Sequence, residues 1–199
     1  MLDLNQNDLT FSPVQKALAS FVERTLKASD TGEFTQPYDP EWPSPCEIRQ
    51  EDDLTVWAPT LRSQTPLNEP LDFSGLANAA EAPIHQDIQD YYSLLWSGTI
   101  LGKTEEGPLS LIQMWNPDDF TRLLENLVGH LFYKIRAKAP FTVFFANTEE
   151  DSELFLSIDN DTGVILLEEP GQPPLREIAP NLATFLDRIE PDFREVEIF

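Results

Sequence analysis

The short spacing of the apolar segments between residues 141 and 167 most strongly limits the folds open to this chain. Strands are predicted at 141–146, 154–158 and 164–167, and the turn sequence Asn-Asp-Thr-Gly at 160–163 separates the last two. A parallel crossover needs a dozen or more residues, so strands this close in sequence must pair antiparallel. We therefore expect an antiparallel sheet.

Helical patterns flank these strands. A serine N-cap followed by proline begins a helix predicted over about 13–27. Apolar residues at helical spacing continue over 73–96, where Pro83 is expected to divide the pattern into two helices. A closing helix is predicted near 182–189. Further short strands are expected around 54–57 and 109–115.

The clearest helix begins after Asn116, which is the predicted N-cap. Asp118 and Asp119 lie in the first turn, and Lys134, Arg136 and Lys138 close the last turns, as the helix macrodipole favours. An apolar stripe is expected to be buried against the sheet. Its members are Phe120, Leu123, Leu124, Leu127, Val128, Leu131, Phe132 and Ile135.

The chain is strongly acidic, with 35 Asp and Glu against 13 Lys and Arg and a net charge of −22. Residues 1–100 and 147–199 each carry a net −11, and residues 101–146 are neutral. This surface repels nucleic acid and attracts cationic partners. Because 41% of the residues are hydrophobic, the acidity does not indicate disorder. We expect one α+β domain over 1–199, with helices covering a mainly antiparallel sheet.

Terminal and cysteine patterns indicate a soluble, non-secreted protein. No stretch approaches the roughly 18 apolar residues of a membrane span, and residues 1–7 lack the basic and apolar regions of a signal peptide. The single cysteine, Cys46, excludes an intrachain disulfide and fits a reducing compartment. It is expected to be a small buried hydrophobe.

Carboxylate pairs are the first candidates for catalysis. A two-carboxylate hydrolase could use Asp118 with Asp119, or Glu149 with Glu150. Adjacent acids are expected by chance in so acidic a chain. First-turn acids and a solvated loop explain the two pairs better than catalysis does, so no catalytic residue is assigned.

Metal and cofactor motifs are equally weak. The run at 159–163 resembles the start of a calcium loop, but the twelfth position, where a bidentate glutamate belongs, is Pro170. Two histidines and one cysteine are too few for a structural zinc site. No nucleophile elbow, phosphate loop or dinucleotide fingerprint is present. We expect no metal and no cofactor, and we favour binding over catalysis.

One helical segment, residues 125–131, is unusual. If its leucines and valine are buried, Glu125, Asn126, Gly129 and His130 face the other side. Glycine costs about 1 kcal/mol relative to alanine in a helix interior, so we expect something to pack close to the backbone at Gly129. His130 is expected to be a hydrogen-bonded structural histidine.

These motifs resemble the Syd family of SecY-interacting bacterial proteins. Trp-Asn-Pro-Asp-Asp-Phe at 115–120 runs into Glu-Asn-Leu-Val-Gly-His-Leu at 125–131, and Pro-Ser-Pro-Cys at 43–46 lies upstream. The resemblance spans roughly 43–190, with motifs in the same order. Further matching segments are 91–92, 96–98, 141–146, 148–150, 181–183 and 185–186.

The resemblance implies a non-enzymatic cytoplasmic protein, peripheral on the inner membrane through SecY, the channel subunit of the protein translocase. It implies that the protein regulates or monitors SecY, and that its fold is the α+β fold of the Smi1/Knr4-like (SUKH) superfamily. Immunity proteins against bacterial toxins belong to the same superfamily. Toxin neutralisation is therefore the alternative function.

An acidic surface suits this partner, because cytoplasmic loops of membrane proteins are rich in Lys and Arg. Complementary charge mainly raises the association rate, and the net charge is expected to keep the protein off anionic lipid unless SecY is present. The candidate partner-binding residues are Asp87, Asp118, Asp119, Glu125, Asn126, His130, Glu149, Glu150 and Glu153.

Overall fold

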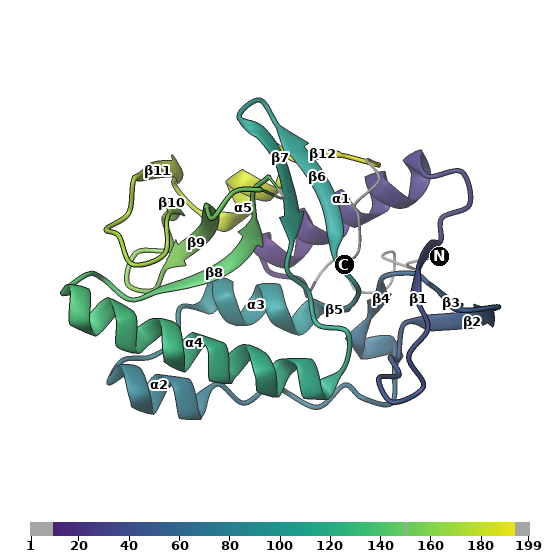
Figure 1. The fold of residues 1–199 in the computed structure, drawn as a ribbon, viewed down its shortest axis with the longest axis horizontal. Coiled ribbons are helices and arrows are strands. Elements are labelled where there is room, and N and C mark those ends of the chain that lie inside the picture. The colour runs from purple at the N-terminus through teal and green to yellow at the C-terminus, as the bar shows by residue number, and fades with distance from the viewer. Residues whose placement is uncertain (1–9, 150, 194–199) are drawn as a thin grey trace.

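The computed structural model describes residues 10–149 and 151–193, which form an α+β fold built on a curled antiparallel sheet (Figure 1). This confirms the predicted fold class. In the described part of the chain five α-helices surround the sheet. They are α1 (Pro13–Ala28), α2 (Ser74–Ala80), α3 (Gln86–Leu94), α4 (Pro117–Ala137) and α5 (Leu182–Leu186).

The main sheet has seven strands in the order β11-β10-β9-β8-β7-β6-β12, and every neighbouring pair is antiparallel. Short connections force the antiparallel pairing of β8, β9 and β10, as the spacing of the apolar segments predicts, whereas the pairs β7–β8 and β6–β12 join strands far apart in the sequence. β6, β11 and β12 were not predicted. The strands are β6 (Ile100–Thr104), β7 (Gly107–Leu111), β8 (Thr142–Asn147), β9 (Phe155–Asp159), β10 (Ile165–Glu168), β11 (Arg176–Ala179) and β12 (Glu190–Pro191).

A smaller sheet of order β1-β3-β2 lies at the opposite end of the molecule from the C-terminus of α4 (Figure 1). Its strands are β1 (Phe34–Pro37), β2 (Glu47–Glu51) and β3 (Leu54–Trp57); β4 (Thr60–Leu61) pairs with β5 (Leu95–Trp96), and a 3-10 turn, η2, spans Arg62–Gln64. Only β3 was predicted, since β1 and β2 flank the proline-rich passage and carry few buried side chains.

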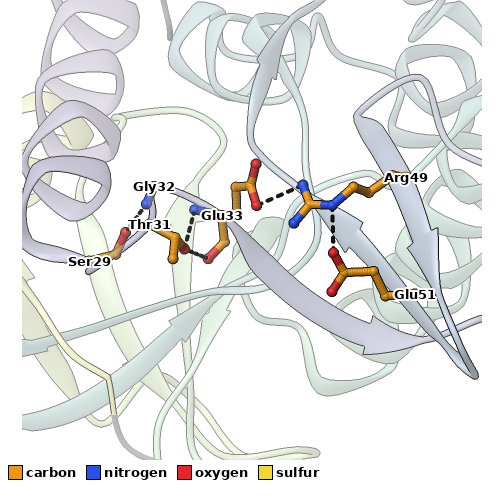
Figure 2. A network of polar contacts seen from close by, with 6 residues as sticks. All are labelled: Ser29, Thr31, Gly32, Glu33, Arg49 and Glu51. Atoms are coloured by element: carbon orange, nitrogen blue, oxygen red, sulfur yellow. Dashed lines mark hydrogen bonds and ion pairs between the residues drawn. The ribbon is translucent and has the colours of Figure 1, made fainter.

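Exposed polar contacts link α1 to this small sheet. Figure 2 shows Arg49 of β2 between two carboxylates, with its Nη1 2.8 Å from Glu33 Oε2 and its Nε 2.6 Å from Glu51 Oε1. Ser29, at the end of α1, accepts a 2.7 Å hydrogen bond from the Gly32 amide. Glu33 and Glu51 are thus paired with Arg49, far from α4.

Helices pack on both faces of the main sheet. The β8 residue Phe145 contacts Tyr91 of α3 and Phe185 of α5 edge-on. Its neighbour Phe144 contacts His130 of α4. Because adjacent strand residues point to opposite faces, α4 covers one face while α3 and α5 cover the other.

The motif at the start of α4 holds the proline-rich loop in place. The Asn116 side chain caps α4 by accepting hydrogen bonds from the Asp118 and Asp119 amides, and its own amide donates to the Pro43 carbonyl. Trp115 Nε1 donates to the Trp42 carbonyl at 2.8 Å. Trp115 and Asn116, which belong to the sequence motif at 115–120, therefore hold the proline-rich loop against α4.

Cys46 is buried beside this motif. Burial raises the pKa of its thiol to about 12, so Cys46 behaves as a small hydrophobic residue, as expected.

The expected apolar stripe of α4 is only partly buried. Leu123, Leu127 and Leu131 are buried, but Phe132 and Ile135 are exposed, so the prediction for those two was wrong. The sheet covers the helix from one side only, and the aliphatic stem of Lys134 occupies the buried position of the last turns instead. The expectation at Gly129 was also wrong: nothing described lies within 4 Å of an added Cβ.

Candidate functional site

A groove of about 580 Å³ lies between the C-terminal half of α4 and the strands β8, β9 and β10. Its α4 side is made by His130, Tyr133, Lys134 and Ala137, in the turns around and beyond Leu131, the last buried leucine of the helix. The loop after β10 closes the far side. The groove is lined by Ile112, His130, Tyr133, Lys134, Ala137, Phe144, Asn147, Ser152, Glu153, Leu154, Phe155, Glu168, Glu169, Pro170, Gly171 and Gln172.

A buried ion pair forms part of the groove lining. Lys134 Nζ contacts Glu168 Oε2, and the hydroxyl of Ser157 donates to the other oxygen, Glu168 Oε1. The Lys134 and Glu168 side chains are only 6% and 1% exposed. Each buried charge is therefore partnered, as low-dielectric surroundings require. The charges of Lys134 and Glu168 cancel each other, so this lysine does not offset the charges of Glu153 and Glu169 in the groove.

His130 lies against the sheet beside this pair. Its Nε2 is 2.9 Å from Thr142 Oγ1, and its ring meets Phe144 and Phe155 edge-on at 5.8 Å. Burial lowers the pKa of His130, the nearby Lys134 charge lowers it further, and Glu168 partly opposes them. The predicted hydrogen bond is present. The predicted outward orientation was wrong, because His130 and Lys134 are four residues apart and share the sheet-facing side.

The candidate acids in the β8–β9 connection do not all reach the same hollow. Glu153 is exposed and lines the groove. Glu149 is exposed and lines a smaller hollow of about 290 Å³ near the β6–β7 turn, together with Glu106 and Arg176. Glu150 lies outside the described residues. These acids remain candidates for binding.

The candidates at the start of α4 lie away from the groove. Asp118, Glu125 and Asn126 are exposed. Asp119 is half-buried and accepts a 2.9 Å hydrogen bond from the Trp115 amide; burial raises its pKa. At about 1.5 Å per residue, Asp118 lies about 18 Å along the helix axis from His130. Asp118 and Glu125 are thus exposed acids of the N-terminal half of α4 that do not line the groove.

Asp87 lies apart from both the groove and the other candidate acids. It lies in the first turn of α3, on the helix layer that covers the opposite face of the sheet. It is half-buried, and burial raises its pKa. We therefore see no common surface that joins Asp87 to the groove.

Several groove residues were missed by sequence reasoning. Tyr133, Phe155 and Glu169 line it, yet none was singled out. The alternation along β8 and β9 carries the only usable signal, since Phe144 and Phe155 occupy positions facing the α4 side. Their convergence with Tyr133 depends on how the helix docks.

The described residues contain no group of three or more His, Cys, Asp or Glu arranged to hold a metal ion. Within the same residues, none of the helices has the length and apolar character needed to span a membrane. The lining of the groove offers aromatic surface, a buried ion pair and exposed acids to a ligand. That combination suits a polypeptide with basic and apolar side chains.

Comparison with known proteins assigns the family. Residues 15–191 match the model of the family described as Syd protein (SUKH-2). Protein Syd of Pseudoalteromonas atlantica is 43% identical over 158 residues, 77% of this chain and 82% of the relative. Protein Syd of Yersinia enterocolitica is 33% identical over 185 residues, covering 92% and 98%. On this sequence evidence, together with the α+β fold, the chain belongs to the Syd family.

Proposed function

We propose that this protein is a non-enzymatic binding protein that interacts with the SecY subunit of the protein translocase and regulates or monitors it. Binding takes place at the cytoplasmic face of the bacterial inner membrane. The exposed acids Asp118, Glu125, Glu149 and Glu153 meet basic cytoplasmic loops, and Glu150, which lies outside the described residues, is included by its position in the sequence. No cofactor takes part.

The observation that carries this proposal is the groove beside α4. Its apolar side chains, among them Tyr133, Phe144 and Phe155, offer contact area, and Glu153 and Glu169 add negative charge. The only lysine in the lining, Lys134, is paired with Glu168. A basic loop with an apolar side chain therefore finds both attraction and burial there. A toxin-immunity role is not favoured, because the curated relatives compared above are named Protein Syd.

A salt series on SecY-containing inner-membrane vesicles tests the proposal. Pull-down is expected at low salt and is expected to weaken as salt rises, because screening shortens the reach of surface charge. The triple variant Glu125→Lys, Glu149→Lys, Glu153→Lys is expected to slow association about tenfold, as steering charges act mainly on the on-rate.

The triple variant Asp30→Lys, Glu41→Lys, Asp53→Lys is the matched control. It makes the same change in net charge at exposed positions around the small sheet. Equal weakening by both variants would mean that only net charge matters. Failure of the wild type to capture SecY at any salt concentration would overturn the proposal.

A further inference from the structure

The C-terminal end of α4 exposes apolar side chains that nothing in the described structure covers. Phe132 is 58% exposed, Tyr133 63% and Ile135 56%. Among the large hydrophobic side chains found exposed in the described residues, these three are the only ones that fall within four consecutive positions. Tyr133 borders the groove, whereas Phe132 and Ile135 do not line it. Binding in the groove therefore leaves Phe132 and Ile135 unexplained.

The charge at this end is opposite to that of the rest of the molecule. Residues 126–148 contain no Asp or Glu, although the chain has 35, and they contain Lys134, Arg136 and Lys138. Lys134 is paired with Glu168, but Arg136 and Lys138 are exposed. The outer face of α4 thus changes from acidic at Asp118 and Glu125 to basic and apolar in its last two turns.

Exposed aromatic and aliphatic side chains flanked by arginine and lysine are the chemistry of an interfacial membrane contact. The apolar groups enter the headgroup region, and the cations meet lipid phosphates. Of the acids in the adjoining groove, Glu168 is paired with Lys134, whereas Glu153 and Glu169 oppose the approach of an anionic surface. The cations suit lipid phosphates and the carboxylates of a second copy alike, so the apolar side chains decide the occupant: a bilayer interface takes up Phe132 and Ile135, whereas the solvated carboxylates of a second copy leave them uncovered.

We propose that Phe132, Ile135, Arg136 and Lys138 form a lipid-facing patch that touches anionic phospholipid while the neighbouring groove binds SecY. The inference rests on the proposed function, because a net charge of −22 weakens attachment to an anionic bilayer by the patch alone, so that only partial flotation with such vesicles is expected without SecY. A second attachment supplies what one weak signal lacks. The patch and the groove share the same end of α4, at the left of Figure 1.

Binding to SecY in three environments tests the patch. SecY complexes are placed in detergent, in phosphatidylcholine nanodiscs and in nanodiscs that also contain phosphatidylglycerol. The variant Phe132→Ser, Ile135→Ser is expected to bind about tenfold more weakly than wild type in the phosphatidylglycerol nanodiscs and equally well in detergent. Arg136→Gln, Lys138→Gln is expected to weaken binding only where phosphatidylglycerol is present.

The control variant is Ile48→Ser, Leu54→Ser, which removes two apolar side chains that are 50% and 42% exposed on the small sheet at the other end of the molecule. It should bind like wild type in all three environments. An equal loss for the Phe132 and Ile135 variant in detergent would mean that the patch contacts SecY itself, and no loss anywhere would also overturn the lipid assignment. Self-association of wild type that this variant abolishes would assign the patch to a second copy.

Failure of the proposed function gives a different result. If wild type binds SecY in none of the three environments, the SecY proposal fails and vesicle flotation decides the lipid contact separately. Flotation of the full chain with phosphatidylglycerol vesicles at low salt, lost in the Phe132 and Ile135 variant but kept in the control, would support the patch. No flotation in that case would overturn it.

Discussion

His130 Nε2 lies 2.9 Å from Thr142 Oγ1, and this hydrogen bond joins α4 to the first strand of the groove. Thr142 is buried and His130 is half-buried, with the rings of Phe144 and Phe155 packed edge-on against the imidazole. The neutral imidazole is therefore the form that suits the folded protein. Protonation of His130 is therefore expected to lower the stability of the folded protein.

Acidification is expected to destabilise the protein through His130. Its pKa in the folded state is lowered, mainly by burial, relative to about 6.5 in the unfolded chain. Its stabilising contribution is complete above about pH 6.5 and is lost as pH falls through the folded-state pKa. Thermal melts of wild type and His130→Gln should diverge in pH dependence below that pH, with the variant flatter. Parallel curves would contradict the assignment.

Carboxylates with raised pKa values act in the opposite direction and at lower pH. Burial raises the pKa values of Asp87 and Asp119 in the folded state. They therefore oppose folding above their unfolded-state pKa, near 3.9. Comparing wild type with His130→Gln at each pH cancels these contributions, because both proteins retain the two acids.

Breaking the buried ion pair on one side is expected to be costly. Lys134→Met leaves Glu168 ionised, buried and short of a partner, which should lower the free energy of unfolding by about 3–5 kcal/mol. The double variant Lys134→Met, Glu168→Gln removes both charges and should regain most of that loss, with Ser157 still able to hydrogen-bond. Urea titrations measure both values. A double variant as unstable as the single one would show that the pair contributes through packing.

Two glycines should respond in opposite ways to alanine. A Cβ on Gly98 would lie 2.7 Å from Cζ2 of the rigid Trp57 ring, so Gly98→Ala should destabilise by about 1–3 kcal/mol. Gly129 lies inside α4 with open space around it, so Gly129→Ala should stabilise by about 0.5–1 kcal/mol. Thermal or urea unfolding of the two variants in parallel gives the comparison. A destabilised Gly129→Ala would mean that the site has a neighbour which the monomer lacks.

The two functions of Asn116 can be separated. Asn116→Ala removes the cap of α4 and the hydrogen bond to the Pro43 carbonyl, and should cost about 1–2 kcal/mol. Asn116→Ser keeps an acceptor for the cap and loses the contact with Pro43, so it should cost less. The difference between their unfolding free energies measures the cap. Equal losses would assign the effect to the loop contact.

Sequence patterns predicted the elements whose signals are local. Asn116, Pro117 and the basic last turns mark both ends of α4, and Ser12 is the expected N-cap of α1, where it also forms a capping box with Gln15. β8, β9 and β10 were predicted because short turns leave no other pairing. β1, β2, β11 and β12 were missed, since they are short and half-exposed and depend on a neighbouring strand for their hydrogen bonds. The two-residue strands β4 and β5 and the strand β6 were missed as well.

Local sequence determined where helices begin and end, which strands pair antiparallel and how acidic the surface is, because capping, turn length and charge act over a few residues. Only the tertiary structure decided that His130 packs inward, that Lys134 is buried with Glu168, and that Phe132 and Ile135 remain exposed. A helical stripe wider than its contact with the sheet can be covered in more than one way. The way in which α4 docks on the curled sheet decides which of its apolar side chains are buried. It thereby decides where the groove lies and which end of α4 stays uncovered.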